Sequence, residues 1–255
     1  MKFQLLNFLV LLTILLLLGG IAKFDWPFFY VVFPVFLWFI AVSLAASHIR
    51  WNFFLRAVSK GNSSGKKIAL TFDDGPHPEY TPAVLELLEK YQAKASFFCI
   101  GKKVKHYPEI LQKIHSLGHS IGNHSFSHSY FIDFNSTNRW KEEIEFTNLE
   151  IEKAIGQKPV FFRPPYGITT PELARAVLKT GHVVVGWNIR SFDTFKKPEQ
   201  VIKKVLKQAK SGSIILMHDH RPEIIPILEN LLPELLSRNF IFVTVEELID
   251  YETHT

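Results

Sequence analysis

Two adjacent carboxylates, Asp73 and Asp74, follow a short apolar run in the stretch LTFDDGPHPEYTP, residues 70–82. The turn signal Gly75-Pro76 comes directly after them, so a surface turn is the simplest interpretation of this stretch on its own. Paired carboxylates can also serve a hydrolytic site, in which one binds a metal and the other accepts a proton from water. That second interpretation requires partner side chains elsewhere in the chain.

Two histidines offer such partners, because His124 and His128 lie four residues apart in NHSFSH. This spacing would place both imidazoles on one face of a helical turn. Two imidazoles and one carboxylate form a three-ligand set that leaves coordination positions open, as in a catalytic rather than a structural zinc site. The sequence therefore predicts one divalent ion. Zn²⁺ fits these ligands best, and Co²⁺ or Ni²⁺ would also suit imidazole.

The elements that must position these residues alternate along the chain after residue 66. Segments with helical periodicity predict helices at 81–91, 136–156 and 170–181. Apolar runs predict seven strands, at 68–72, 95–100, 120–122, 160–162, 183–187, 214–217 and 240–243. This alternation indicates an α/β fold of parallel βαβ units, either a small barrel or a doubly wound sheet.

A barrel would gather polar side chains at one rim, because its active site lies at the carboxyl ends of the strands. Polar residues follow or end five of the seven predicted strands, namely Asp73 and Asp74, His124 and His128, Arg163, Arg190 and Asp193, and His218. A leaving group needs a proton donor from another strand, and His218 is well placed for that role. The rim would thus hold acids, imidazoles and a guanidinium.

Four motifs, TFDDGP, HSFSH, RPPYG and LMH, occur in this order between residues 71 and 218. They closely resemble those of the polysaccharide deacetylase family, carbohydrate esterase family 4, whose shared region is the NodB homology domain. The resemblance covers most of residues 66–250 and leaves out the N-terminal part. It implies a distorted (β/α) barrel, here with about seven parallel strands, that uses a divalent metal to remove acyl groups, usually acetyl, from sugars.

The resemblance also implies a role for each motif residue. Asp73 would be the catalytic base, and Asp74, His124 and His128 would bind the metal. Arg163 would orient the base, the backbone N–H of Tyr166 would help to hold the oxyanion, and His218 would be the acid. Leu216 would line the acyl pocket, and we expect the remaining substrate contacts from Pro165, Tyr166 and Trp187.

One motif departs from the family pattern, which usually has an acidic residue followed by Trp after the fifth strand. Here Thr194 follows Asp193. Asp193 could still pair with Arg163 or tune His218. The missing indole leaves the shape of the site wall open, and with it the substrate.

The N-terminal part contains two uncharged apolar stretches, residues 3–21 and 26–47. Each is about long enough to cross a bilayer as a helix, which takes roughly 20 residues. We expect a membrane hairpin of two helices over 1–47, a juxtamembrane segment and flexible linker over 48–65, and the catalytic domain over 66–255. A cleaved signal peptide is the alternative for the first stretch, although LLLLGGIAK makes a poor cleavage site.

The net charge divides unevenly, with +4 in residues 1–65 and +1 in the remainder. A basic footprint for nucleic acid is absent from the soluble part. Basic residues flank the apolar stretches, which favours a cytoplasmic catalytic domain. The single cysteine, Cys99, lies in an apolar run and is expected to be buried and inert.

These patterns predict a membrane-anchored, metal-dependent hydrolase that removes acyl groups, N-acetyl in the first place, from a glycan or a lipid-linked sugar. Two alternatives stay open. One is a metal-dependent amidohydrolase acting on a small non-sugar amide. The other is a sugar-binding module without activity on the same fold. The intact pair of Asp73 and His218 argues against the second alternative.

Overall fold

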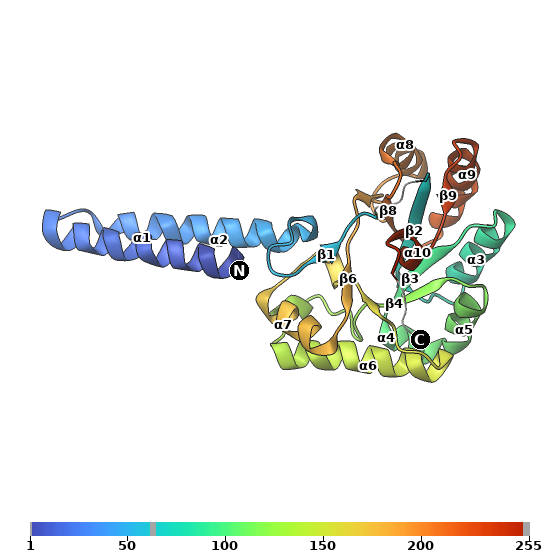
Figure 1. Cartoon of the computed structure of the whole chain (residues 1–255), viewed down its shortest axis with the longest axis horizontal. Coiled ribbons are helices and arrows are strands. Elements are labelled where there is room, and N and C mark those ends of the chain that lie inside the picture. Colours follow the sequence, from blue (N-terminus) through green and yellow to red (C-terminus); the bar gives the residue numbers. More distant parts are fainter. Residues whose placement is uncertain (1, 62–64, 252–255) are drawn as a thin grey trace.

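The computed structural model describes residues 2–61 and 65–251, and it combines a two-helix hairpin with an α/β domain (Figure 1). The hairpin consists of α1 (Lys2–Phe24), η1 (Phe28–Val31) and α2 (Val32–Ser47). Both of its apolar stretches are long and apolar enough to cross a membrane, and few of their residues are buried inside the protein. The centre of the expected flexible linker, 62–64, lies outside the described residues.

The described residues of the domain form one sheet in which all strand pairs are parallel. Its order is β1-β6-β5-β4-β3-β2-β8-β7, and β9 also pairs with β2. The strands are β1 (Ala57–Val58), β2 (Lys67–Gly75), β3 (Ala95–Cys99), β4 (Ser120–Asn123), β5 (Phe161–Phe162), β6 (Val183–Val185), β7 (Ile189–Arg190), β8 (Ile214–His218) and β9 (Ile241–Phe242).

Strands β2 to β6 lie side by side in chain order, and β8 and β7 continue the sheet on the other side of β2, which is the order of a curled (β/α) barrel left open between its edge strands β1 and β7. The predicted distorted (β/α) barrel is therefore confirmed, and each of the seven predicted strands has a counterpart. The short strands β1 and β7 are additional. The predicted strand at 183–187 ends early, since β6 stops at Val185.

Helices follow most strands and cover the outside of the sheet (Figure 1). They are α3 (Tyr80–Lys90), α4 (Gly101–His106), α5 (Pro108–Ser116), α6 (Thr137–Ile155), α7 (Pro171–Thr180), α8 (Pro198–Gln208), α9 (Ile224–Ser237) and α10 (Val245–Leu248), with the 3₁₀ turns η2 (Ile49–Trp51), η3 (Ile132–Phe134) and η4 (Pro165–Gly167).

The three predicted helices are present, and their ends show why these segments are helical. The side chain of Thr170 accepts a hydrogen bond from the Leu173 N–H at the start of α7, and Gly181 ends that helix in the left-handed region. Ser136 caps α6 in the same way, and Gly156 ends it. These helices pack apolar faces on strands that are buried on both sides, as in parallel sheets generally.

The segment 48–65, expected to be a juxtamembrane segment and linker, contributes to the domain. Its residues Ala57 and Val58 pair with Val184 and Val185 of β6. Ile49 is buried in the same apolar cluster as Ala57 and Val184. We therefore propose that the folded domain begins near residue 48, because these contacts leave little free chain between α2 and the sheet.

Candidate active site

An irregularity at the end of β2 turns both aspartates toward one cavity. Asp73 pairs with Phe98 of β3, but the next paired residue is Gly75, so the register shifts between them. Asp74 occupies the extra position with φ of 72°. In a regular strand, adjacent side chains point to opposite faces, and a bulge of this kind re-aims one of them. The surface-turn interpretation is therefore wrong, because Asp73 is buried and both carboxylates line the cavity.

The two histidines meet through a loop rather than through the expected helical turn. Residues 124–128 follow β4 without helical structure, and both Ser125 and His128 have positive φ. The carboxylate of Glu143 on α6 accepts hydrogen bonds from the N–H groups of Phe126 (3.0 Å) and Ser127 (2.7 Å). This buried anchor fixes the loop, so that the rings of the two histidines lie 5.0 Å apart.

Asp74, His124 and His128 form a compact cluster in which the possible ligand atoms all lie within 4.8 Å of one another. Oδ1 of Asp74 is 3.5 Å from Nε2 of His124 and 3.2 Å from Nε2 of His128. Burial would raise the pKa of Asp74, but contact with His124 and the charges of the nearby imidazoles hold it below its usual range. Burial lowers the pKa of His128 to about 4, with a further contribution from His124.

Arg163 holds Asp73 from behind the cavity. Its Nη1 donates to Oδ1 of Asp73 at 2.6 Å and to the hydroxyl of Thr71 at 2.8 Å. Nε and Nη2 donate to the carbonyl oxygens of Val185 and Gly186, respectively. The guanidinium is fully buried, and these acceptors leave it one orientation. A buried, charge-assisted pair of this kind fixes one carboxylate oxygen of Asp73 and leaves Oδ2 for the cavity.

Asp193 pairs with His218 on the other side of the cavity. Its Oδ1 lies 3.0 Å from Nδ1 of His218, and its Oδ2 accepts from the His218 backbone N–H at 2.8 Å. A carboxylate only accepts, so Nδ1 carries the proton and Nε2 is free. Burial lowers the pKa of His218, but the hydrogen bond and charge of Asp193 raise it more, to about 9. Of the two expected roles for Asp193, this contact supports tuning of His218 rather than pairing with Arg163.

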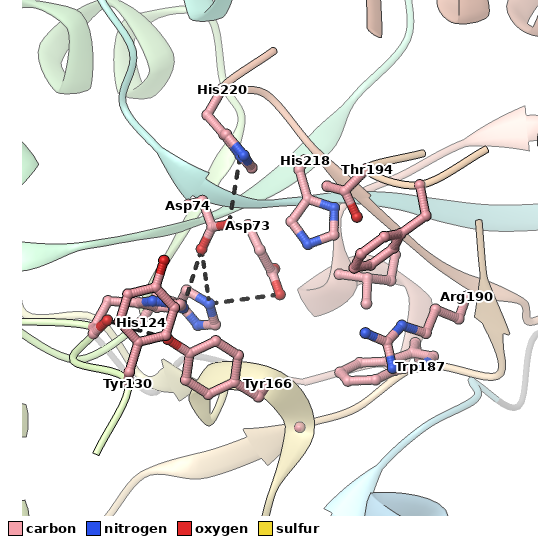
Figure 2. Close-up of a pocket in the computed structure, with 14 residues that line it drawn as sticks. Asp73, Asp74, His124, Tyr130, Tyr166, Trp187, Arg190, Thr194, His218 and His220 are labelled. Carbon is pink, nitrogen blue, oxygen red and sulfur yellow. Dashed lines mark hydrogen bonds and ion pairs between the residues drawn. The ribbon is translucent and has the colours of Figure 1, made fainter. Parts of the chain in front are cut away.

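These groups surround one cavity of about 420 Å³ (Figure 2). Asp73, Asp74, His124, His128, Tyr166, Trp187, Leu216 and His218 line it, as the sequence led us to expect. Arg163 and Asp193 act from behind the wall through the contacts above. Pro165 was expected at the substrate, but it is buried and is not among the lining residues.

Comparison with known proteins places this geometry in a family. A family model described as polysaccharide deacetylase matches residues 60–185. A peptidoglycan-N-acetylglucosamine deacetylase from Bacillus cereus is 37% identical over 196 residues, which are 73% of this chain and 90% of that protein. The chain belongs to the polysaccharide deacetylase family.

Other relatives differ from this chain in length, and their names mention different substrates. A chitooligosaccharide deacetylase from Azorhizobium caulinodans is 40% identical over 162 residues, which cover 61% of this chain and 74% of that protein. The chain spans 39% of the length of longer relatives from Listeria monocytogenes. The crystal structure of the Bc1960 peptidoglycan N-acetylglucosamine deacetylase superimposes with a TM-score of 0.72 and 28% identity, covering 77% of this chain and 94% of that one.

Sequence reasoning missed several residues of this polysaccharide deacetylase site. Nδ1 of His220 lies 3.4 Å from Oδ2 of Asp74, on the opposite side of this carboxylate from His124 (Figure 2). His220 lies two residues after His218 in the sequence, but only His218 was given a role. Tyr130, Arg190, Thr194 and Phe195 also line the cavity. The sequence had placed Arg190, now at the end of β7, at the rim and had named Thr194 beside Asp193. No spacing rule could have found Tyr130 and Phe195, because they lie on loops whose paths depend on the whole fold.

Proposed function

We propose that this chain is a metal-dependent hydrolase that removes N-acetyl groups from a glycan of N-acetylated amino sugars. The observation that carries the proposal is the arrangement of two held groups around one cavity. Asp73 is fixed by Arg163, and His218 is fixed by Asp193, with the cluster of Asp74, His124 and His128 beside them. Relatives named as peptidoglycan and chitooligosaccharide deacetylases support the choice of substrate class.

The cluster fits a divalent cation, with Zn²⁺ preferred and Co²⁺ or Ni²⁺ also suitable. Nδ1 of His124 lies 2.8 Å from the carbonyl oxygen of Arg163, to which it donates, so Nε2 keeps its lone pair for a metal. Oδ1 of Asp74 is buried, and no hydrogen bond from the described residues satisfies it. When bound, the metal would acidify a water and polarise the acyl carbonyl.

Asp73 would act as the general base on the attacking water. Its Oδ1 is occupied by Arg163, whereas Oδ2 faces the cavity at 3.8 Å from Nε2 of His124. The proton of the water would pass to Oδ2 as the oxygen attacks the acyl carbon. The buried guanidinium of Arg163 holds the carboxylate in one orientation for that step.

His218 would then act as the general acid. Its raised pKa keeps the ring protonated at neutral pH, and the proton on Nε2 would go to the sugar nitrogen as the C–N bond breaks. An amide needs this proton, because an amine leaves far more readily than an amide anion. Leu216 and Trp187 line the same cavity and would contact the acyl group and sugar. The backbone N–H of Tyr166 is the proposed oxyanion donor.

We also propose that the hairpin anchors the enzyme in a membrane. Its Leu and Phe side chains are largely exposed, so they do not form the core of a soluble protein, and a bilayer would remove them from water. The proposed organisation is a membrane hairpin over 1–47, followed by the catalytic domain. The substrate would then be an acylated glycan or lipid-linked sugar close to the membrane.

Deacetylation assays on the full chain in detergent test this function. We expect the purified protein to release acetate from chito-oligosaccharides, detected by mass spectrometry, and His124→Ala to lose both bound metal and activity. Hydrolysis of small amides without hydrolysis of glycans would instead identify an amidohydrolase. Glycan binding without turnover by metal-loaded protein would identify an inactive sugar-binding module.

A further inference from the structure

The loop before α6 exposes three aromatic side chains. Tyr130, Phe131 and Phe134 are 87%, 75% and 85% exposed. Ile132, between them, is almost fully buried in the apolar cluster below. The 3₁₀ turn η3 holds the loop. In this turn the N–H of Phe134 donates to the carbonyl oxygen of Phe131 at 3.1 Å. The loop, residues 130–134, is therefore a built structure that presents aromatic rings to its surroundings.

This aromatic loop lies on the side of the domain from which the hairpin emerges. It leads directly into α6, and Nε of Arg175 on α7 donates to the hydroxyl of Thr137 at the start of α6 at 3.1 Å. Just before α7, the N–H of Thr169 donates to the carbonyl oxygen of Ala46 on α2 at 3.0 Å. In Figure 1, α7 and one end of α6 form the edge of the domain nearest the hairpin.

The loop is also continuous with the wall of the catalytic cavity. Tyr130 lines the cavity and stacks on Tyr166 with ring centroids 6.4 Å apart. Phe131 and Phe134 are not among the cavity-lining residues. Phe offers no hydroxyl or N–H to a sugar, in contrast to Tyr and Trp. The outer part of the loop therefore suits an apolar surface better than a glycan.

Basic and aromatic residues at the domain end of the hairpin also suit the surface of a lipid bilayer. Lys2, Arg50 and Arg56 are exposed there, as is the ring of Trp51. Aromatic rings gather at the boundary between lipid and water, and exposed basic side chains attract anionic headgroups. Asp133 in the middle of the loop is only partly exposed. Its carboxylate opposes deep insertion and limits the loop to the headgroup boundary.

We propose that Phe131 and Phe134 dock on the lipid surface of the membrane that the hairpin spans, so that the cavity opens beside the bilayer. This inference rests on the proposed membrane anchoring. It has a consequence for substrate selection. Tyr130 in the cavity wall belongs to this loop. The docked enzyme would therefore prefer sugars held close to the lipid headgroups over sugars on a distant polymer.

Lipid quenching of a fluorescent probe tests the docking on the full chain. In a Cys99→Ser background, single cysteines would replace Phe131 or Phe134 and carry the environment-sensitive probe NBD. The protein would be reconstituted into vesicles of phosphatidylethanolamine and phosphatidylglycerol, with or without brominated acyl chains. Leu15→Cys on the exposed face of α1 is the membrane reference, and Ser237→Cys at the far end of α9 is the aqueous control.

We expect brominated lipid to reduce NBD emission at positions 15, 131 and 134 but not at 237. Quenching at position 15 with no more quenching at 131 and 134 than at 237 would overturn the docking and leave the anchor intact. An unquenched probe at 15 would overturn the anchor itself, and the docking with it. Emission at 134 that shifts with chitotetraose, but not with brominated lipid, would make the loop a glycan surface and refute lipid docking.

Discussion

Neighbouring aspartates can perform different tasks when the fold gives them different partners. Asp73 faces a buried guanidinium, whereas Asp74 faces three imidazoles. The bulge at the end of β2 separates these surroundings over one residue. Gly75 follows the two aspartates for a steric reason. A Cβ at this position would lie 2.5 Å from the buried carboxylate of Asp219.

The first prediction separates the two aspartates. Asp73→Asn keeps the size of the side chain but removes its ability to accept a proton, so turnover should fall by about 10²- to 10⁴-fold. Metal content should stay at the parental level, because the proposed ligand is Asp74. Metal analysis and deacetylation kinetics on one preparation check both statements. Turnover within a few fold of the parent would mean that another group is the base.

The second prediction concerns the pH profile. His218 must be protonated to act as an acid, so activity should fall as the pH rises through its pKa, which Asp193 holds at about 9. Asp193→Asn removes the charge that raises this pKa, so the basic limb of the kcat/KM profile should move to lower pH. Profiles of the parent and variant, measured over the same buffers, provide the test. An unmoved basic limb would exclude His218 as the titrating acid.

The third prediction assigns His220 a role through Asp74. His220 contacts Oδ2 of Asp74 at 3.4 Å, and partners that orient a metal-binding carboxylate typically change metal affinity by about 10- to 100-fold when removed. His220→Ala should therefore bind Zn²⁺ more weakly in calorimetric titration of the metal-free protein. His115→Ala, on the exposed surface of α5, is the matched control. Equal affinity in both variants would leave His220 without this role.

Residue types and their order were enough to predict which acids and imidazoles line one cavity, because the carboxyl ends of parallel strands meet at one rim of the sheet. The resemblance also named Arg163 as the partner of Asp73, but the sequence did not show what fixes the Arg163 guanidinium or which partner Asp193 takes. Arg163 donates to the carbonyl oxygens of Val185 and Gly186. These acceptors are backbone atoms, so no sequence pattern predicts them. Asp193 had two plausible partners in the sequence, and the choice between them depended on the path of the chain after β7.

At the scale of elements, α6 contributes to the site without reaching the cavity. Glu143 in this helix anchors the loop of the two histidines by accepting from two backbone N–H groups. The rest of the helix packs Trp140 and Ile144 into the core. Packing of the helix and geometry of the metal cluster are thus coupled through one buried carboxylate.

The fourth prediction tests that coupling. Glu143→Leu leaves two N–H groups without an acceptor, and each unmade bond to a buried group costs about 1–3 kcal/mol. We expect a lower melting temperature and weaker Zn²⁺ binding. Glu143→Gln keeps a carbonyl oxygen as acceptor and should retain most of both properties. Thermal denaturation with and without metal provides the measurement. Equal losses in Gln and Leu variants would show that the negative charge matters rather than the acceptor.

Sequence patterns predicted the elements that carry their own signals and missed others, among them the long helices α8 and α9 and the short strands β1 and β7. Helices such as α7 carry their own start and stop signals in Thr170 and Gly181. The two-residue strands β1 and β7 have no such signal, because their pairing comes from neighbours far along the chain. The spacing of His124 and His128 suggested a helical turn, and this prediction was wrong. Two side chains four residues apart can also meet in a loop that a distant helix anchors.

At the scale of the whole molecule, the proposed membrane hairpin determines on which side of the membrane the domain lies. A hairpin of two spans returns the chain to the face where it began, so the N-terminus and the domain share one side. Lys2, Arg50, Arg56 and Lys60 stand at that end, whereas the loop between the helices carries Lys23 and Asp25. Positive residues near span ends favour the cytoplasm. The sequence and the hairpin together therefore predict a cytoplasmic domain.

Cysteine labelling of intact cells tests this last prediction. In the Cys99→Ser background, Glu86→Cys reports the domain and Asp25→Cys reports the tip of the hairpin, and both positions are exposed. An impermeant maleimide should label position 25 and leave position 86 unlabelled until lysis. Labelling of 86 alone would place the domain outside, where wall polymer is within reach and a cytoplasmic lipid-linked precursor is not. Labelling of both positions would refute the hairpin, because two spans cannot expose tip and domain on one face.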